Sequence, residues 1–182
     1  KKIILPSRML WDKGIKDFIF CAKKIKKKLN ARFILVGNPD PHNPESIHLT
    51  TLKKWNSEGY VEWWEHKEDM VKIYEDSTIV CLPSYREGLP KVLIEAGSIG
   101  RPVVSYDVAG CKEVIVNNKN GLLVPFREKT LLSKAIYKLL DNVELCKKMG
   151  LNGREIIEQN FSEKIIFDQI SNVWTEALRK KL

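Results

Sequence analysis

The sequence contains no apolar run of the roughly 18 residues needed to cross a bilayer, and its first residues show no signal-peptide pattern. It also lacks three fingerprints: the Gly-x-Ser-x-Gly elbow, the Walker phosphate loop and the Rossmann glycine pattern. A membrane-spanning segment and these three kinds of site are therefore not expected.

Cysteine is scarce and scattered. The cysteines form no Cys-x-x-Cys pair, and Cys81 lies inside an apolar stretch. This spacing favours buried free thiols in a reducing cytosol over metal ligation. The cysteines are Cys21, Cys81, Cys111 and Cys146.

The chain length of 182 residues fits one domain with a full-sized core. The first residue, Lys1, is not a methionine and stands almost directly against an apolar stretch. We therefore expect the sequence to be a piece of a longer protein.

The net charge is +8, and much of it comes from one lysine cluster on a predicted helix with an apolar stripe. A solvated outer face explains such a cluster most simply, and attraction to an anionic membrane surface is the functional alternative. No nucleic-acid partner is expected, because no basic stripe interleaved with aromatics accompanies the lysines. The cluster consists of Lys23, Lys24, Lys26, Lys27 and Lys28.

Apolar runs alternate with helical patterns along the whole chain, which predicts an α/β fold. We expect a Rossmann-like, doubly wound parallel sheet of about six strands with helices on both faces. Strands are predicted at 2–6, 33–37, 60–64, 78–82, 102–106 and 121–124. Helices are predicted at 14–29, 46–58, 69–77, 89–99, 128–140, 143–158 and 162–180.

In such sheets ligands bind beyond the carboxyl ends of the strands. The loops expected at that edge are 7–13, 37–38, 84–88 and 107–110. The most informative of these joins the apolar strand 78–82 to an apolar helix through a turn with Gly88 at the bend and Pro90 near the helix start. Its free backbone N–H groups predict an anion site.

Two glutamates, Glu87 and Glu95, flank this turn with seven residues between them. The stretch Glu87-Gly88-Leu89-Pro90…Glu95 resembles the E-x7-E motif of the family 4 (group 1) retaining glycosyltransferases, which have the GT-B fold. The likeness runs from Ser7–Gly14 to Asn120–Pro125. It implies that residues 1–182 form a single nucleotide-sugar (donor) binding domain, and that an N-terminal acceptor-binding domain lies outside this sequence.

The resemblance assigns the diphosphate to Arg8 and Lys13, the donor sugar to Glu87 and the ribose diol to Glu95. It places phosphate at the backbone N–H groups of Gly88 and of three residues at the helix start, Leu89, Lys91 and Val92. From the residues alone, Arg8 and Lys13 fit exposed basic side chains equally well. Without the resemblance, Glu95 fits an ordinary surface pair with Lys91 better.

Three further positions match the family near the donor. Gly37 and Gly110 match glycines beside the nucleotide and the diphosphate, and Val61 begins the segment whose backbone contacts the base. Trp63 and Trp64 in that segment also fit core aromatics. Glu65 departs from the family pattern, in which glycine is common.

The sequence has no Asp-x-Asp, the metal–diphosphate motif of other glycosyltransferases. We therefore expect no metal and no cofactor beyond the UDP-sugar substrate, with positive side chains and the helix start in place of the cation. His42, His48 and His66 show no metal-ligand spacing and are expected at the surface.

The stretches 55–64 and 81–93 resemble enzymes that extend undecaprenyl-diphosphate-linked sugars or build capsule. They imply a UDP-N-acetylhexosamine donor and a glycan or polyprenyl-diphosphate-linked acceptor held by the missing domain. The isolated domain is expected to transfer little or no sugar.

The protein is expected in the cytoplasm, with peripheral contact to the inner face of the cytoplasmic membrane as an open possibility. A binding-only module and a nucleotide-sugar epimerase remain the alternatives. The apolar stripe of the last helix needs a partner, which the resemblance implies is the N-terminal domain.

Overall fold

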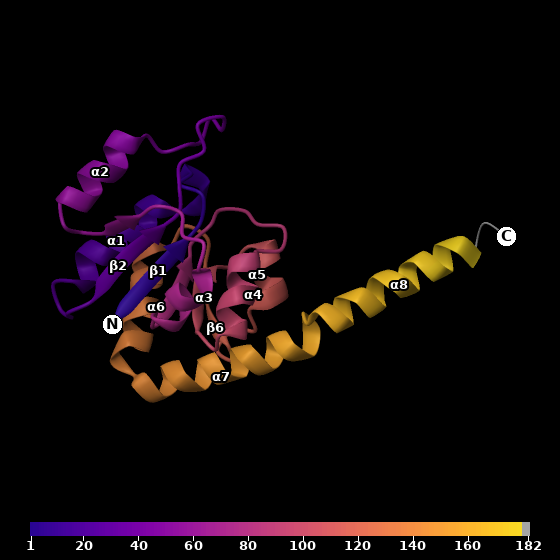
Figure 1. Cartoon of the computed structure of the whole chain (residues 1–182). Coiled ribbons are helices and arrows are strands. Elements are labelled where there is room, and N and C mark those ends of the chain that lie inside the picture. Colours follow the sequence, from indigo (N-terminus) through magenta and orange to yellow (C-terminus); the bar gives the residue numbers. More distant parts are fainter. Residues whose placement is uncertain (180–182) are drawn as a thin grey trace.

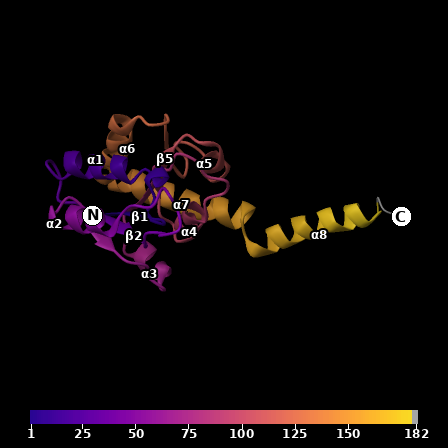
Figure 2. The same ribbon diagram turned by 90° about the horizontal axis from the view of Figure 1, so that it is seen from above.

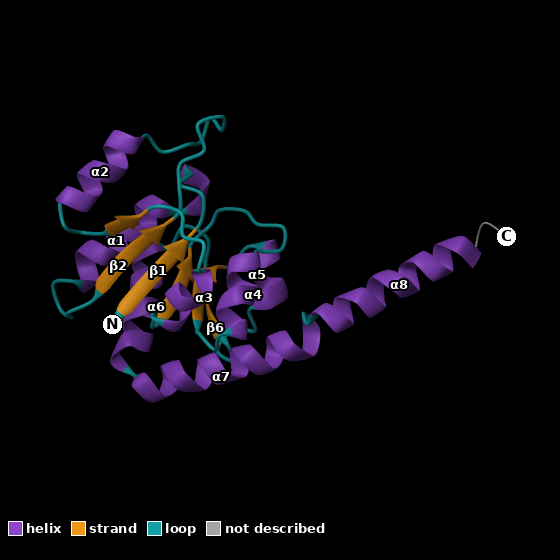
Figure 3. Ribbon diagram, in the orientation of Figure 1, coloured by secondary structure: helices purple, strands orange, loops and turns teal. Residues whose placement is uncertain are grey.

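The computed structural model of the chain describes residues 1–179. Its centre is a parallel sheet (Figure 3), made of β1 (Lys2–Pro6), β2 (Arg32–Val36), β3 (Glu62–Trp64), β4 (Ile79–Leu82), β5 (Val103–Tyr106) and β6 (Gly121–Val124). The strand order is β3-β2-β1-β4-β5-β6. The predicted fold class is confirmed. The order reverses between β1 and β4, and in open α/β sheets this switch point opens a crevice at the carboxyl ends of the strands.

Helices cover both faces of the sheet (Figures 1 and 2). One core cluster joins the sheet to α1 (Ile15–Ile25), α2 (Leu49–Ser57) and α6 (Lys129–Asp141). The other joins it to α3 (Met70–Glu75), α4 (Lys91–Ser98) and α5 (Ala109–Val114). Helix α7 (Val143–Asn160) contributes to both clusters, through Met149 to the first and Ile157 to the second. The strands are therefore buried on both sides, which explains their continuous apolar runs.

Several elements differ from the sequence-based expectation. Helix α1 ends at Ile25 rather than at residue 29, and the short 3-10 helix Trp11–Lys13 before it was not predicted. Helix α5 was not predicted, because its six residues are too few for a helical period to stand out from the loop before it. Helix α2 begins at Leu49 rather than at 46, because Ser46 and Ile47 pair with the loop after β1: Ser46 forms a bridge with Leu10, and Ile47 N donates to Met9 O at 2.8 Å.

The last helix, α8 (Glu163–Arg179), extends away from the rest of the chain (Figure 1). None of its residues is buried. Residue 180, the last of the predicted helix, lies outside the described residues. The apolar stripe read from the sequence is largely exposed and includes Ile166, Ile170, Val173, Trp174 and Leu178. Across residues 1–179, no helix is both long and apolar enough to cross a membrane.

All four cysteines are free and buried. Burial raises the pKa of the Cys111 thiol to about 11, and it also raises those of Cys21, Cys81 and Cys146.

The thiolate is the reactive form of cysteine. We therefore expect Ellman's reagent at pH 8 to react slowly with the native protein. After unfolding in guanidinium chloride, it should react with all four thiols. Rapid reaction of one thiol in the native protein would contradict this.

Candidate functional site

A cleft of about 420 Å³ opens at the carboxyl edge of the sheet, beyond β1 and β2. Its walls come from the loop after β1, the loop after β2, helix α3 and the first half of α4. Four of the candidate donor-site residues line it: Arg8, Gly37, Val92 and Glu95. The structure thus brings together residues from three separate segments at the switch point of the sheet.

Arg8 lies at the rim of this cleft with its side chain 62% exposed. Its Nη1 donates to Oδ2 of Asp40 at 2.7 Å. Asp40 belongs to the proline-rich loop after β2, and the backbone N–H of Asp40 is held by Ser46 Oγ at 3.0 Å. The guanidinium is therefore held in place by a carboxylate that an anionic ligand could replace.

Glu95 lies across the cleft on α4, where Tyr74 of α3 holds its carboxylate. The Tyr74 hydroxyl donates to Glu95 Oε2 at 2.7 Å. Tyr74 is only 2% exposed, and burial, followed by the bond to Glu95, raises the pKa of its phenol. Within residues 1–179, no ion pair links Glu95 to Lys91. Tyr74 thus fixes a carboxylate that sequence spacing alone would pair with a surface lysine.

Lys13 and Glu87 form a second polar group beside the start of α4. Lys13 Nζ donates to Glu87 Oε1 at 2.8 Å, and the two side chains are only 16% and 14% exposed. The loop that carries Glu87 is tied to the loop after β1 because Tyr85 N donates to Asp12 O at 2.8 Å. The two loops that flank the switch point therefore form one connected unit.

Three glycines allow these loops to approach one another. A Cβ on Gly110 would lie 2.5 Å from the carbonyl oxygen of Glu87 and would also overlap the carbonyl of Gly88. Gly37, at φ +135°, faces the carbonyl of Ser7, and Gly14, at φ +71°, faces that of Pro83. Only a residue without a Cβ fits such contacts.

The start of α4 lies next to the Lys13–Glu87 pair. Pro90 is the N-cap residue rather than the first helical residue, and it makes no side-chain cap. Lys91 and Gly88 are exposed, and Leu89 is 50% exposed. The backbone N–H groups of the first helical turn are therefore open to an anion at this point.

Val61 is not brought to the site. It is 1% exposed and precedes β3, so it lies at the far end of that strand from the cleft. His66 lines the cleft instead, with its backbone N–H held by Asn38 Oδ1 at 2.9 Å. Trp63 is partly buried against the core, and its Nε1 donates to Gly37 O at 2.9 Å. Both tryptophans, Trp63 and Trp64, pack against core residues.

Within the described part of the chain, no group of three or more histidine, cysteine or acidic side chains is placed to hold a metal ion. Besides Glu95 and Lys91, the cleft and the α4 start carry two cations, Arg8 and Lys13, each paired with a carboxylate.

An open sheet of this order with a polar cleft at its switch point is the arrangement in which α/β proteins bind nucleotides. The family described as "Glycosyl transferases group 1" matches residues 1–156. The chain belongs to this family of glycosyltransferases.

Its relatives include N,N'-diacetylbacillosaminyl-diphospho-undecaprenol alpha-1,3-N-acetylgalactosaminyltransferase of Campylobacter jejuni, 31% identical over 97% of this chain and 45% of that protein. The capsular polysaccharide biosynthesis glycosyltransferase CapM of Staphylococcus aureus is 28% identical over 95% of this chain and 45% of its own length. The chain therefore spans about half the length of these relatives.

A solved structure of an S. aureus TarM variant, in complex with fondaparinux, alpha-GlcNAc-glycerol and UDP, matches 94% of this chain and 35% of its own. The TM-score is 0.82 at 28% sequence identity. The likeness supports the fold recognised from the sequence, and the complex shows that TarM binds UDP.

Proposed function

We propose that this chain is the donor-binding domain of a retaining glycosyltransferase that uses UDP-N-acetylhexosamine. The observation that carries the proposal is the convergence of Arg8 and Glu95 on one cleft, with the Lys13–Glu87 pair beside it. A nucleoside diphosphate sugar needs cations at its phosphates and acceptors for its hydroxyl groups, and these side chains supply both.

In this proposal the diphosphate binds between Arg8, Lys13 and the backbone N–H groups of Gly88, Leu89, Lys91 and Val92 at the start of α4. Glu95 accepts hydrogen bonds from the ribose, and Glu87 accepts them from the donor sugar. Gly37 and the backbone near His66 border the base, and Gly110 lets the Glu87 loop close on the sugar. Positive charge from Arg8 and Lys13 stabilises the departing diphosphate without a metal ion.

The acceptor hydroxyl attacks the face of the sugar from which the nucleotide leaves, and a phosphate oxygen takes its proton. We propose that the acceptor, a glycan or a polyprenyl-diphosphate-linked sugar, is held by a second domain, which also covers the exposed stripe of α8. The names of the Campylobacter and Staphylococcus relatives, which include diphospho-undecaprenol and capsular polysaccharide, support this acceptor class. The reaction is assigned to the cytoplasm, at the inner face of the membrane.

The test is thermal unfolding of the chain with UDP, UDP-N-acetylhexosamines, GDP and ADP. Ligand at about 100 times its dissociation constant should add roughly 2.7 kcal/mol, or about 5–10 °C for a domain of this size. The shift should be selective for uridine and should disappear in Arg8→Ala and Glu95→Ala. Arg154→Ala is the matched control, because that side chain is also 62% exposed but pairs with Glu158 on α7. A shift that survives in both site variants would contradict the proposed site.

Catalysis is tested in the full-length enzyme with Glu87→Ala and Glu95→Ala. A transferase should lose most of its activity in both variants, whereas a binding-only module should be little changed. Conversion of the UDP-sugar without any acceptor would indicate an epimerase. Measurable transfer by residues 1–182 alone would contradict the need for a second domain.

The buried Tyr74 is a positioning residue in this proposal. In Tyr74→Phe the carboxylate of Glu95 loses the hydrogen bond that orients it. We therefore expect UDP to bind about fivefold more weakly, which corresponds to a loss of about 1 kcal/mol of binding free energy. Isothermal titration calorimetry measures the change. Tyr60→Phe is the control, because Tyr60 is 37% exposed and lies far from the cleft, beneath Lys23. Equal affinities in Tyr74→Phe and the unmodified chain would exclude the positioning role.

A further inference from the structure

A groove of about 520 Å³ lies between the end of α1 and the outer side of α6, which pack together on one face of the sheet (Figure 2). Its lining combines lysines from both segments with Thr130, Ser133 and Tyr137. The lysines are Lys24, Lys27, Lys28, Lys134 and Lys138. All five are exposed.

This groove divides the lysine cluster seen in the sequence. Lys23 lies over the ring of Tyr60 at 4.2 Å, and Lys26 Nζ donates to Gly59 O at 2.8 Å. Those two lysines therefore turn toward the loop after α2. The other three line the groove together with Lys134 and Lys138 of α6. The sequence shows only the α1 half of the arrangement, because the α6 half lies more than a hundred residues away.

Throughout residues 1–179, none of the five groove lysines has a carboxylate within ion-pair distance. Two of the groove lysines instead lie over aromatic rings: Lys24 is 4.9 Å from the ring of Phe20, and Lys28 is 5.9 Å from that of Tyr137. Like charges that face one another without counter-charges favour binding of an anion.

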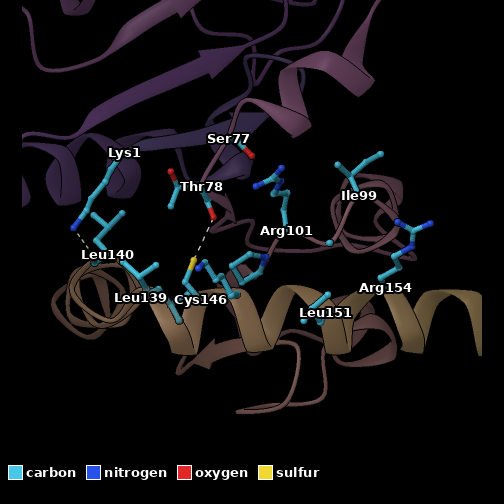
Figure 4. Close-up of a pocket in the computed structure, with 14 residues that line it drawn as sticks. Lys1, Ser77, Thr78, Ile99, Arg101, Leu139, Leu140, Cys146, Leu151 and Arg154 are labelled. Atoms are coloured by element: carbon cyan, nitrogen blue, oxygen red, sulfur yellow. Dashed lines mark hydrogen bonds between the residues drawn. The ribbon is translucent and has the colours of Figure 1, made fainter.

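A second hollow of the chain differs in this respect (Figure 4). It measures about 480 Å³ and lies at the opposite edge of the sheet from the cleft, against α7. Three of its four cations already have partners: Lys1 donates to the carbonyl of Leu140, Lys147 pairs with Glu144, and Arg154 pairs with Glu158. The fourth, Arg101, has a buried Nε without a hydrogen-bond partner in the described part of the chain. The α1–α6 groove, with five lysines and no paired carboxylate, therefore offers more unpaired positive charge to an external anion than this hollow does.

We propose that the α1–α6 groove docks the protein onto a membrane surface that contains anionic phospholipids. Five lysines line one hollow of about 520 Å³, and a cluster of four or more lysines is typical of binding to anionic lipid headgroups. An exposed apolar side chain stands beside them: Leu131, 39% exposed, is three residues before Lys134 on α6. Cations flanked by exposed apolar groups are typical of interfacial binding.

The groove is separate from the donor cleft. Lys24 lies nine residues after the first residue of α1, which corresponds to about 14 Å along the helix axis, and no groove residue lines the cleft. Docking through this surface leaves the cleft open. The proposal does not rest on the proposed donor chemistry, and the two can fail independently.

The test is co-sedimentation of the chain with vesicles made of equal parts phosphatidylglycerol and phosphatidylcholine, beside vesicles of phosphatidylcholine alone. We expect binding only to the anionic vesicles, and a strong decrease when salt is raised to about 0.5 M. The groove variant Lys24→Glu/Lys134→Glu/Lys138→Glu should bind at least tenfold more weakly. The matched variant Lys53→Glu/Lys72→Glu/Lys148→Glu changes the net charge equally, at exposed positions on α2, α3 and α7, and should stay within about twofold of the unmodified chain.

Equal losses in the two variants would overturn the proposal, because net charge alone would then explain the attraction. Absence of binding to anionic vesicles would also overturn it. If inositol hexakisphosphate or single-stranded DNA binds through the groove while vesicles do not, the occupant is a soluble polyanion and the membrane assignment is wrong. The thermal shift with UDP, measured in the groove variant, should equal that of the unmodified chain, which separates this result from any failure of the donor site.

Discussion

Replacing Gly110 with alanine is expected to lower the midpoint of thermal unfolding by about 6–12 °C. The added Cβ would lie 2.5 Å from the carbonyl oxygen of Glu87 and would overlap the carbonyl of Gly88. Both obstacles are backbone atoms, which cannot rotate away, so the Glu87 loop and the start of α5 must separate. Overpacking of this kind costs up to about 3 kcal/mol, and each kcal/mol corresponds to about 2–4 °C in a domain of this size.

Gly88→Ala is the matched control, since it places the same methyl group on the other side of the same contact. A Cβ on Gly88 meets nothing within 4 Å, so its melting temperature should change by no more than about 2 °C, corresponding to the ±0.5 kcal/mol typical of a surface substitution. Differential scanning calorimetry on the two variants measures the difference. If the melting temperatures of Gly110→Ala and Gly88→Ala differ by less than about 2 °C, the Glu87 loop and the start of α5 do not pack as the structure describes. We also expect Gly110→Ala to lose the thermal shift with UDP, because the Glu87 loop would be displaced.

The sheet was predictable from the sequence because strands buried on both faces leave continuous apolar runs, such as Ile79–Leu82. The edge that carries the site was predictable for the same reason: once the strands are parallel, the loops that follow them share one edge. The close approach of the backbone to Gly110 was also predictable, because only a residue without a Cβ fits such a contact. Helix α5, which contains Gly110, was too short to be predicted from the sequence.

The partners of the site residues were not predictable. Asp40 lies 32 residues from Arg8, and Tyr74 lies 21 residues from Glu95. Such pairs depend on how separate loops and helices pack, and no period or short motif records that packing. The same limit explains Val61: we expected the segment that begins at Val61 to border the base, but the register Val36↔Trp64 puts the end of β3, not its start, beside the cleft. The same register places His66, two residues after β3, beside the cleft.

The Arg8–Asp40 pair leads to a prediction in which two neighbouring substitutions act with opposite signs. Arg8→Ala removes a guanidinium that we assign to the donor diphosphate. Hydrogen bonds to charged groups contribute about 1.5–3 kcal/mol, so UDP should bind about 10–150-fold more weakly. Asp40→Asn removes the carboxylate that holds the same guanidinium at 2.7 Å. The diphosphate then no longer competes with a negative charge for Arg8, and UDP should bind about two- to fivefold more tightly.

The double variant Arg8→Ala/Asp40→Asn separates this competition from a general change in cleft charge. If Asp40 acts through Arg8, the double variant should bind UDP as weakly as Arg8→Ala alone, because the group for which the two anions compete is gone. If Asp40 only repels the ligand through its charge, the double variant should bind UDP about two- to fivefold more tightly than Arg8→Ala does. Asp76→Asn, whose carboxylate pairs with Lys2 away from the cleft, controls for the loss of one negative charge. Isothermal titration calorimetry at fixed salt compares all four variants, and weaker binding by Asp40→Asn would show that this carboxylate supports the donor site rather than occupying its place.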